Sequence, residues 1–318
     1  MDIIQAIILG IVQGLTEFIP ISSTAHLIFA GRLTGLSATL SAEQMTATIA
    51  VIQLGTLAAV FVYFARDIWA ICFAFVRDHL ALFGVGGAAS SARGAGGGFW
   101  SRLSNEARLG WLIFVGSLPI GAVGLVFKDE IEGRFTKNLW VIAAMMIIVA
   151  LLLAAAERVG ARRREMEELG LRDALAVGCA QVLALIPGAS RSGSTMMGGL
   201  FAGETRETAA RFSFLLSIPA ITASGLLEMK EAVEKLPAGS ALPLAVATVV
   251  SGLVGYASIW FLLRFLRTHS TGVFIGYRII VGALILVLLA LGTIQPLEGG
   301  PEANPHAARA GVVETARR

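Results

Sequence analysis

The sequence predicts an all-α polytopic membrane protein, with six spanning helices and two re-entrant helical hairpins arranged as an inverted-topology repeat. Three observations predict this fold. The chain of 318 residues is 56% hydrophobic and only 15% charged, whereas soluble domains carry about 25% charged residues. The apolar residues come in runs that approach the ~20 residues a helix needs to cross a bilayer. Two further apolar regions are interrupted by small polar residues.

Six apolar stretches are predicted to span the membrane. Prolines interrupt two of them, at Pro119 and Pro219, and neighbouring helices can satisfy the backbone groups that a proline frees. With the hairpins they form a single membrane domain over residues 1–295. The tail, 296–318, combines prolines, small residues and scattered charges and is predicted to be disordered. The stretches are 45–64, 110–127, 139–156, 212–227, 243–263 and 279–294.

The two interrupted regions, 3–38 and 174–203, are predicted to be the re-entrant hairpins. Each begins with a helix-like run, breaks into small polar residues and then resumes briefly. Irregular backbone at membrane depth is tolerated only inside protein or beside a water-filled cavity. The two breaks read Pro20-Ile21-Ser22-Ser23-Thr24 and Pro187-Gly188-Ala189-Ser190-Arg191-Ser192-Gly193-Ser194-Thr195.

The hairpin regions match each other at a constant offset of 168 residues, which indicates an internal repeat over about 1–156 and 157–295. Three predicted spans separate the two hairpins, so the hairpins enter from opposite faces. Opposite entry is the inverted-topology arrangement, in which broken helices meet near the midplane. The identities are Gly10 with Gly178, Gln13 with Gln181, Leu15 with Leu183, and Ser22 with Ser190.

Positive charge assigns the two sides, because Lys and Arg collect in cytoplasmic loops. One side carries six Lys and Arg residues, with three more in the tail, and Arg191 lies inside a hairpin. The other side carries 15 and is predicted to be cytoplasmic, so the first hairpin opens outward. This distribution explains the net charge of +3 without a nucleic-acid partner. The 15 are Arg66, Arg77, Arg93, Arg102, Arg108, Arg158, Arg162, Arg163, Arg164, Arg172, Arg206, Arg211, Arg264, Arg267 and Arg278.

Polar residues in the first hairpin are candidates for chemistry, because polar groups at membrane depth usually mark function. Gln13 and Glu17 are four residues apart and share one helix face. Ser22, Ser23 and His26 follow, and a hydroxyl beside an imidazole and a carboxylate suits nucleophilic or acid–base catalysis. Simpler interpretations are a Glu17 that snorkels to the interface, Ser22 and Thr24 as caps of a helix starting near residue 24, and an interfacial His26.

The second hairpin predicts a phosphate site around Arg191. Glycines let backbone N–H groups approach an anion, and a helix starting near residue 192 directs its positive end there. Arginine adds a permanent charge with bidentate geometry. The alternative is an Arg191 that pairs with Glu17 to stabilise the fold. The residues themselves predict hydrolysis or transport of a phosphate-bearing lipid and do not separate the two.

Two stretches resemble the signatures of the bacterial undecaprenyl-diphosphate phosphatases, the bacitracin-resistance family. The first runs from Gln13 to His26 and the second from Pro187 to Thr195. The resemblance covers roughly residues 1–295. It implies a ten-helix inverted-repeat fold in the bacterial cytoplasmic membrane, with a site open to the outer face. It implies hydrolysis of undecaprenyl diphosphate to the monophosphate, which recycles the lipid carrier for peptidoglycan synthesis, and a divalent cation such as Mg²⁺ or Ca²⁺. Bacitracin competes for this lipid.

The resemblance places Glu17, Ser23, His26 and Arg191 at the family's functional positions. The first acidic position of its motif is Gln13 here, which weakens the idea of two carboxylates sharing the metal. We expect Arg191 to hold the diphosphate and Glu17 to anchor the cation. Ser23 is then the nucleophile and His26 the proton shuttle, with direct attack by water as the rival. The remaining predicted substrate-binding residues are Gln13, Ser22, Thr24, Gly188, Ser190, Ser192 and Thr195.

Two questions stay open at this level. Inverted repeats with broken helices are also the architecture of secondary transporters, so a flippase of undecaprenyl phosphate is the alternative function. The sequence is silent on oligomeric state and is compatible with a homodimer.

Overall fold

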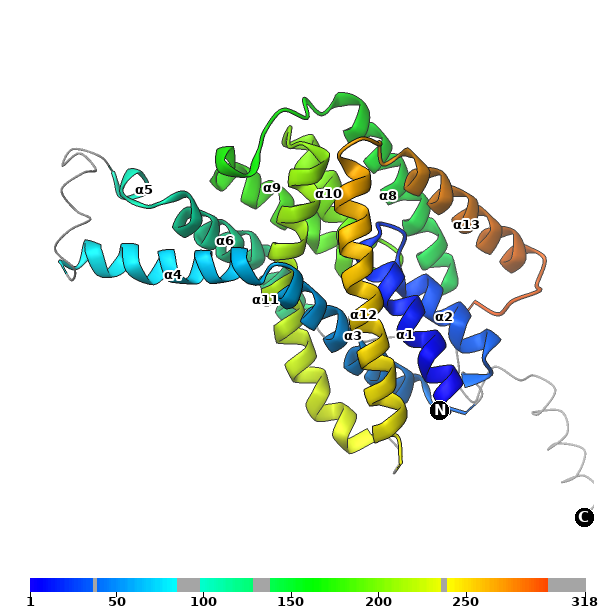
Figure 1. Cartoon of the computed structure of the whole chain (residues 1–318). Helices are drawn as coiled ribbons and strands as arrows, with labels where there is room; N and C mark the ends of the chain where they lie inside the picture. Colours follow the sequence, from blue (N-terminus) through cyan, green and yellow to red (C-terminus); the bar gives the residue numbers. More distant parts are fainter. Residues whose placement is uncertain (37–38, 85–97, 128–137, 236–238, 297–318) are drawn as a thin grey trace, which may run out of the picture.

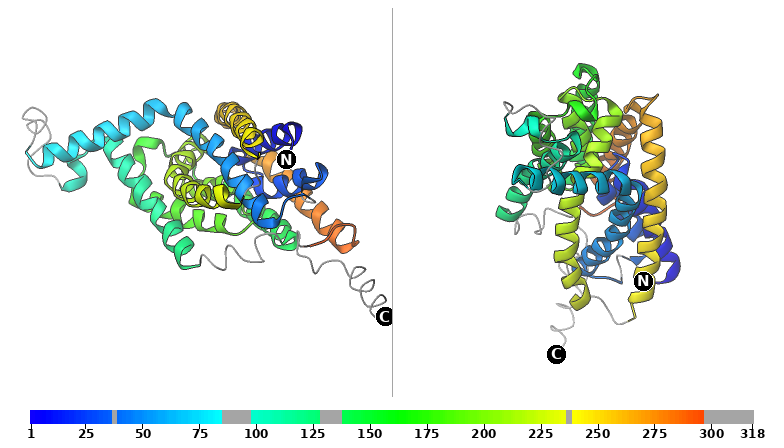
Figure 2. Two further views of the ribbon diagram at one scale, coloured as in Figure 1. Left: turned by 90° about the horizontal axis from the view of Figure 1, so that it is seen from below. Right: turned by 60° about the vertical axis from the view of Figure 1, so that its left-hand side comes forward.

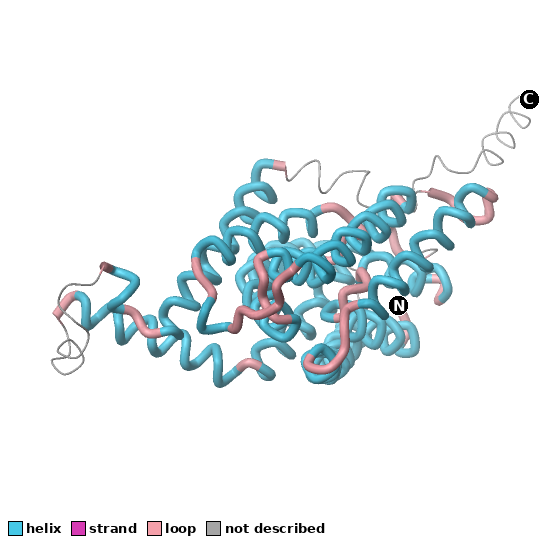
Figure 3. The backbone as a smooth tube through the Cα atoms, turned by 90° about the horizontal axis from the view of Figure 1, so that it is seen from above, coloured by secondary structure: helices cyan, strands magenta, loops and turns pink. Residues whose placement is uncertain are grey.

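All regular structure in the described part of the chain is helical (Figure 3). The computed structural model describes residues 1–36, 39–84, 98–127, 138–235 and 239–296. One isolated bridge joins Arg164 to Glu204. Apart from residue 296, the tail that the sequence predicts to be disordered lies outside the described residues.

Among the described residues, five helices are long and apolar enough to cross a membrane, which confirms an all-α polytopic membrane protein. The sixth predicted span, 212–227, lies inside a 30-residue helix, α11 (Arg206–Lys235), which contains Pro219 and is not among the five. The five are α3 (Ala42–Tyr63), α6 (Asn105–Val126), α8 (Leu139–Val159), α12 (Ala241–Leu266) and α13 (Gly272–Ala290).

The remaining helices are shorter. The two hairpin regions contain α1 (Ile3–Phe18) with α2 (Ser23–Leu33), and α9 (Leu171–Val182) with the 3-10 turn η4 (Leu183–Leu185) and α10 (Arg191–Phe201). Capping explains where several helices begin. Asp2 with Gln5, and Ser41 with Gln44, form reciprocal capping boxes at α1 and α3, which satisfy backbone donors that a helix start leaves unpaired. The shorter helices outside the hairpin regions are α4 (Ala65–Leu82), α5 (Phe99–Arg102) and the 3-10 turn η3 (Met166–Glu168).

Each predicted hairpin breaks at a serine with left-handed backbone. Ser22 has φ 78° and Ser190 has φ 69°, and the two lie 168 residues apart. A positive φ is uncommon for a residue other than glycine and indicates a turn that the surroundings enforce. The Ser190 side chain accepts from the Gly193 N–H and caps α10. Ser22 is likewise the N-cap residue of α2, as predicted, but its side chain makes no capping hydrogen bond, and Thr24 lies inside the helix.

The first arm of each hairpin packs closely on a long helix from the other half of the chain (Figure 1). α1 lies against α12, and α9 lies against α6. Glycines permit both approaches. A Cβ on Gly10 would stand 2.6 Å from the Ala247 carbonyl oxygen, and a Cβ on Gly178 would stand 2.3 Å from that of Gly116. Both distances are shorter than real Cβ contacts, so neither position accepts a side chain without moving a helix.

The second arm of the second hairpin, α10, packs against α8, α9 and α11, so it is enclosed by helices of both halves. α4 turns away from α3 and runs outward beside α6, as the view from below shows (Figure 2). An aromatic cluster of Phe18, Phe64 and Phe214 lies in the core where α1, α3 and α11 converge. The arrangement brings the end of α1 and the start of α10 together inside the bundle.

Glu204, in the loop between α10 and α11, is a buried acid without a cation. It has no solvent exposure, and neither carboxyl oxygen has a hydrogen-bond partner. The nearby guanidinium of Arg164 pairs with Asp173 instead. Burial, together with the charge of Asp173, raises the pKa of Glu204 to about 8. The folded protein therefore holds a proton on this group at neutral pH.

We predict that Glu204 makes the folded state less stable as the pH rises. Its pKa is raised on folding from 4.5 to about 8, so between these values the unfolded chain releases a proton that the folded chain keeps. The penalty grows by up to about 1.4 kcal/mol per pH unit. The melting temperature in detergent should fall between about pH 5 and about pH 8, and Glu204→Gln should remove much of that fall. The exposed Glu167→Gln is the control; an equal effect in both variants would contradict the assignment.

Candidate active site

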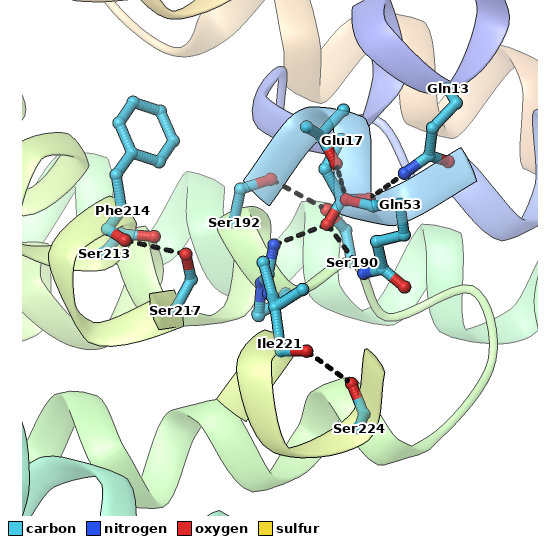
Figure 4. Close-up of polar contacts among 12 residues, drawn as sticks. Gln13, Glu17, Gln53, Ser190, Ser192, Ser213, Phe214, Ser217, Ile221 and Ser224 are labelled. Atoms are coloured by element: carbon cyan, nitrogen blue, oxygen red, sulfur yellow. Dashed lines mark hydrogen bonds and ion pairs between the residues drawn. The ribbon is translucent and has the colours of Figure 1, made fainter. Parts of the chain in front are cut away.

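Glu17, at the end of α1, is the centre of a polar network inside the bundle (Figure 4). Its Oε1 accepts from Arg191 Nη2 at 2.5 Å and from Gln53 Nε2 at 3.1 Å. Its Oε2 accepts from Gln13 Nε2 at 3.0 Å. Glu17 is only 7% exposed, so the interpretation that it snorkels to the interface is wrong. The predicted pairing of Arg191 with Glu17 is present.

This network joins three segments that are far apart in the chain. Glu17 comes from the last turn of α1, Gln53 from α3, and Arg191 from the first residue of α10. The helical spacing of four residues places Gln13 on the same face of α1 as Glu17. The ion pair therefore lies where the two broken helices meet.

A cavity of about 560 Å³ opens beside the ion pair. Glu17 and Arg191 line it together, and four of the predicted hydroxyl residues lie around them: Ser22, Ser23, Thr24 and Ser190. Gln53 of α3, Ser117 of α6 and Ser224 of α11 add further polar groups. The rest of the wall is apolar or glycine. One cavity thus contains a carboxylate, a guanidinium and several hydroxyl groups.

Five residues that the sequence assigns to the site lie outside the cavity lining: Gln13, His26, Gly188, Ser192 and Thr195. Thr195 Oγ1 contacts the Arg191 carbonyl at 2.7 Å and the Ser213 hydroxyl at 2.5 Å, deep in the interior. Gly188 has φ 89°, and a Cβ there would stand 2.3 Å from the Ile142 carbonyl oxygen. Packing and backbone conformation therefore require this glycine.

His26 of α2 is held by two contacts, one with the turn before α2 and one with α13. Its Nδ1 lies 2.7 Å from the Ser22 carbonyl oxygen, and its Nε2 lies 2.7 Å from the Tyr277 hydroxyl. A carbonyl only accepts, so Nδ1 carries a proton, and in the neutral ring Nε2 accepts from Tyr277. The two rings also stack, with centroids 5.6 Å apart. His26 therefore fixes the turn at Ser22, immediately before Ser23.

Arg278 of α13 holds both hairpin breaks in place. Its guanidinium is fully buried and donates to five main-chain carbonyls. Two belong to Met145 and Met146 of α8, at 3.3 and 3.1 Å. The others come from the breaks: Pro20 at 3.3 Å, Gly188 at 3.0 Å and Ala189 at 2.9 Å. Pro20 and Gly188 are equivalent positions at the offset of 168, so one side chain contacts the same point in both loops.

Sequence reasoning missed three of these residues as site components. Gln53 is visible only as a polar residue within an apolar run. Arg278 was counted among the cytoplasmic charges, because the predicted span began at residue 279, whereas α13 begins at Gly272. Tyr277 is outside the predicted site, since nothing in the sequence indicates that it faces His26.

The donor set is consistent with a divalent cation only if the substrate supplies ligands too. Among the described residues there is no group of three His, Cys, Asp or Glu side chains that could hold a metal ion. Of the described residues that line the cavity, Glu17 is the one carboxylate, with amide and hydroxyl oxygens around it. Mg²⁺ is commonly held by one or two carboxylates and by phosphate oxygens of the substrate.

The chain is similar to a family and to curated proteins over most of its length. Residues 6–284 match the family described as bacitracin resistance protein BacA. The undecaprenyl-diphosphatase of Syntrophobacter fumaroxidans is 48% identical over 291 residues, which cover 90% of this chain and 97% of that protein. The undecaprenyl-diphosphatase of Chlorobium luteolum is 44% identical, and the match covers 93% of this chain and 100% of that protein. The undecaprenyl-diphosphatase of Nocardia farcinica is 46% identical, and the match covers 93% of this chain and 98% of that protein.

We predict that Arg278→Met destabilises the fold. The substitution leaves the loop carbonyls of Pro20, Gly188 and Ala189 without the donor they now have, and an unsatisfied buried acceptor costs about 1–3 kcal/mol. The melting temperature of the purified protein should fall by several degrees. The melting temperature of Arg278→Lys should lie between those of Arg278→Met and the unmodified protein, because an ammonium has fewer donors and no planar fork. The exposed Arg66→Met is the control, and an unchanged melting temperature for Arg278→Met would contradict this role.

Proposed function

The chain belongs to the bacitracin resistance protein family, BacA, and on this premise we propose that it is a membrane phosphatase that hydrolyses undecaprenyl diphosphate to undecaprenyl phosphate and phosphate. The observation that carries this proposal is the Arg191–Glu17 ion pair at the polar end of one cavity. A guanidinium in this position can take a phosphate, and a carboxylate released from it can anchor a cation or accept a proton. Recycling the lipid carrier in this way supports peptidoglycan synthesis. Bacitracin competes for the same lipid, so the enzyme confers resistance to it.

Binding begins with Arg191. Its side chain is 15% exposed and now pairs with Glu17. A phosphate oxygen offers the same guanidinium a bidentate, charged partner, so the substrate exchanges one anion for another without leaving the arginine unpaired. The N-terminus of α10 adds its positive end at the same point. Ser190, Ser22 and Thr24 line the same cavity and would lie around the headgroup.

A divalent cation such as Mg²⁺ or Ca²⁺ belongs to the proposal. Glu17 would anchor it once Arg191 has moved to the phosphate, and oxygens of the diphosphate would complete its ligands. When bound, the cation neutralises charge on the phosphate oxygens, which is a general requirement of phosphoryl transfer.

The nucleophile is Ser23, which lines the cavity as the first residue of α2. Its Oγ attacks the terminal phosphorus, the bond to the bridging oxygen breaks, and undecaprenyl phosphate leaves with that oxygen. Water then hydrolyses the phosphoserine. His26 does not line the cavity, so the serine proton goes to one carboxyl oxygen of Glu17, and the other oxygen remains for the cation. The role of His26 in this scheme is to position the Ser22 turn.

The placement in the membrane is also part of the proposal. α11 supplies the sixth crossing, and the hairpins α1–α2 and α9–α10 enter from opposite faces as re-entrant elements of an inverted repeat. The excess of arginine on one side then makes that side cytoplasmic. The cavity opens to the outer face of the cytoplasmic membrane, where the diphosphate lipid is left after each round of wall synthesis.

We predict that Arg191→Ala abolishes phosphate release from undecaprenyl diphosphate. The assay uses purified protein in detergent with Mg²⁺, and a chelator-treated sample serves as the control for cation dependence. The rate should fall at least about a thousandfold, because catalysis here rests on positioning and charge neutralisation. Arg191→Lys should retain part of the rate, since it keeps the charge but loses the bidentate geometry.

An unchanged melting temperature for Arg191→Ala would show that the loss is not a failure to fold. Near-normal release by this variant would refute the role of Arg191. A flippase of the monophosphate would release no phosphate in any form of the protein. Absence of phosphate release by the unmodified protein would therefore refute hydrolysis itself.

We predict that Ser23→Ala lowers the rate at least about a hundredfold, as expected when a covalent nucleophile is removed. Rapid quenching of the unmodified enzyme during turnover should yield phosphoserine at Ser23, detectable by mass spectrometry. The exposed Ser270→Ala should leave the rate unchanged. Substantial turnover by Ser23→Ala, with no phosphoserine in the unmodified enzyme, would instead establish direct attack by water.

A further inference from the structure

We propose that the apolar part of the cavity binds the first isoprene units of the lipid chain, and that Gly121 and Gly124 of α6 set its width. This inference rests on the proposed function, because it assigns the part of the substrate that does not react. The wall of this apolar arm comes from three elements: the second half of α6, the segment around η4, and the middle of α11.

The cavity has two chemically different ends. Glu17 and Arg191 stand at the end that takes the diphosphate. On α6, α11 and the segment around η4 the lining is mostly apolar or glycine, with Ser117 and Ser224 as its polar residues. Its apolar residues are Ile120 and Leu125 of α6, Leu185 and Ile186 beside the second break, and Ile221 of α11. A single space that joins a charged head site to a carbon-lined arm matches a molecule with a charged head and a hydrocarbon tail.

The arm leads to the outer surface of the helix bundle. Leu125 and Ile186 line the cavity and are also 77% and 39% exposed, whereas Ile221, on the inner wall, is 2% exposed. Leu125 is on the spanning helix α6 and Ile186 follows η4 in the second break; exposed apolar side chains of a membrane domain face lipid. The cavity volume, about 560 Å³, is typical of a pocket for a drug-sized ligand, which is much smaller than a polyprenyl chain. The chain therefore leaves the protein sideways, between α6 and the second hairpin.

The two glycines keep this arm open. Within the described part of the chain, a Cβ on Gly121 would have no heavy atom within 4 Å, and a Cβ on Gly124 would meet only Leu185 Cδ2, at 3.9 Å. Gly116, on the same helix, differs: its Cβ would stand 2.9 Å from Leu216 Cδ1 and 3.0 Å from the Ala174 carbonyl oxygen. Gly116 is needed for helix packing. None of the described atoms requires glycine at 121 or 124, and both residues line the cavity.

Larger side chains at these positions should fill the arm without harming the helix. Leucine has a higher helix propensity than glycine. The open space around Gly121 means that the new side chain would not clash with described atoms near its Cβ. The prenyl chain would then lose its path, whereas the charged head site would keep all of its residues. The expected effect is therefore on chain-length selectivity.

The experiment compares two diphosphates with the same reacting group, undecaprenyl diphosphate and isopentenyl diphosphate. Gly121→Leu and Gly124→Leu should each lower the ratio of the two kcat/KM values, long chain over short, by about tenfold or more. Ala122→Leu is the matched control, because Ala122 is the exposed neighbour on α6 and does not line the cavity; its ratio should equal that of the unmodified protein.

A second readout needs no turnover. In a Cys72→Ala/Cys179→Ala background, which removes the two exposed native cysteines, Gly121→Cys should react with an apolar maleimide, and undecaprenyl diphosphate should slow this labelling. Labelling of Ala122→Cys should not respond to the lipid. Two results would refute the proposed binding of the prenyl chain in this arm. One is phosphate release by Gly121→Leu and Gly124→Leu with an unchanged ratio of the two kcat/KM values, and the other is labelling of Gly121→Cys at the same rate with and without the lipid. Absence of release from both diphosphates in every variant would instead overturn the proposed phosphatase, so the two failures are distinguishable.

Discussion

One buried guanidinium holds the active region together. Two helices are broken inside an apolar bundle, and each break leaves carbonyl groups that no helix satisfies. Such groups are costly away from water. Arg278 supplies donors to Pro20 in one break and to Gly188 and Ala189 in the other. Its position is therefore the condition for placing Ser23 and Arg191 in one cavity, although Arg278 itself does not line it.

The two arginines of the region perform different tasks. Arg278 is satisfied by neutral carbonyls and stays inside the protein. Arg191 is satisfied by a carboxylate, and its side chain reaches a cavity. An ion pair can be exchanged for another charged partner, whereas a guanidinium that holds carbonyls cannot move without leaving them unpaired. Preorganised charge of this kind is where enzymes gain most of their electrostatic stabilisation.

The sequence predicted the helices well because apolar runs of spanning length have few other interpretations. It also located both breaks, since polar residues between apolar runs need protein or water around them. The sequence offers the pairing of Glu17 with Arg191 as an alternative to a phosphate site; the structure shows the pair beside a cavity, and the phosphate site stays a prediction. The inverted placement in the membrane stays a prediction.

Directions of side chains could not be predicted. The left-handed turns at Ser22 and Ser190 decide which residues reach the cavity. The pattern of apolar and polar residues along the sequence does not indicate such turns. For this reason Ser23 and Thr24 line the cavity whereas His26 faces Tyr277, and Ser192 and Thr195 turn into the interior. Arg278 was placed in a loop because a charge marks the end of an apolar run, although the helix extends beyond it.

The matching turns at Ser22 and Ser190 place unlike side chains at equivalent positions. Across the offset of 168 residues, Ser23 corresponds to Arg191, and Glu17 corresponds to Leu185. The turn is repeated but the charge is not: one loop presents a hydroxyl where the other presents a guanidinium, and the carboxylate has an apolar counterpart. The cavity is therefore polarised, because its anion comes from one hairpin region and its cation from the other.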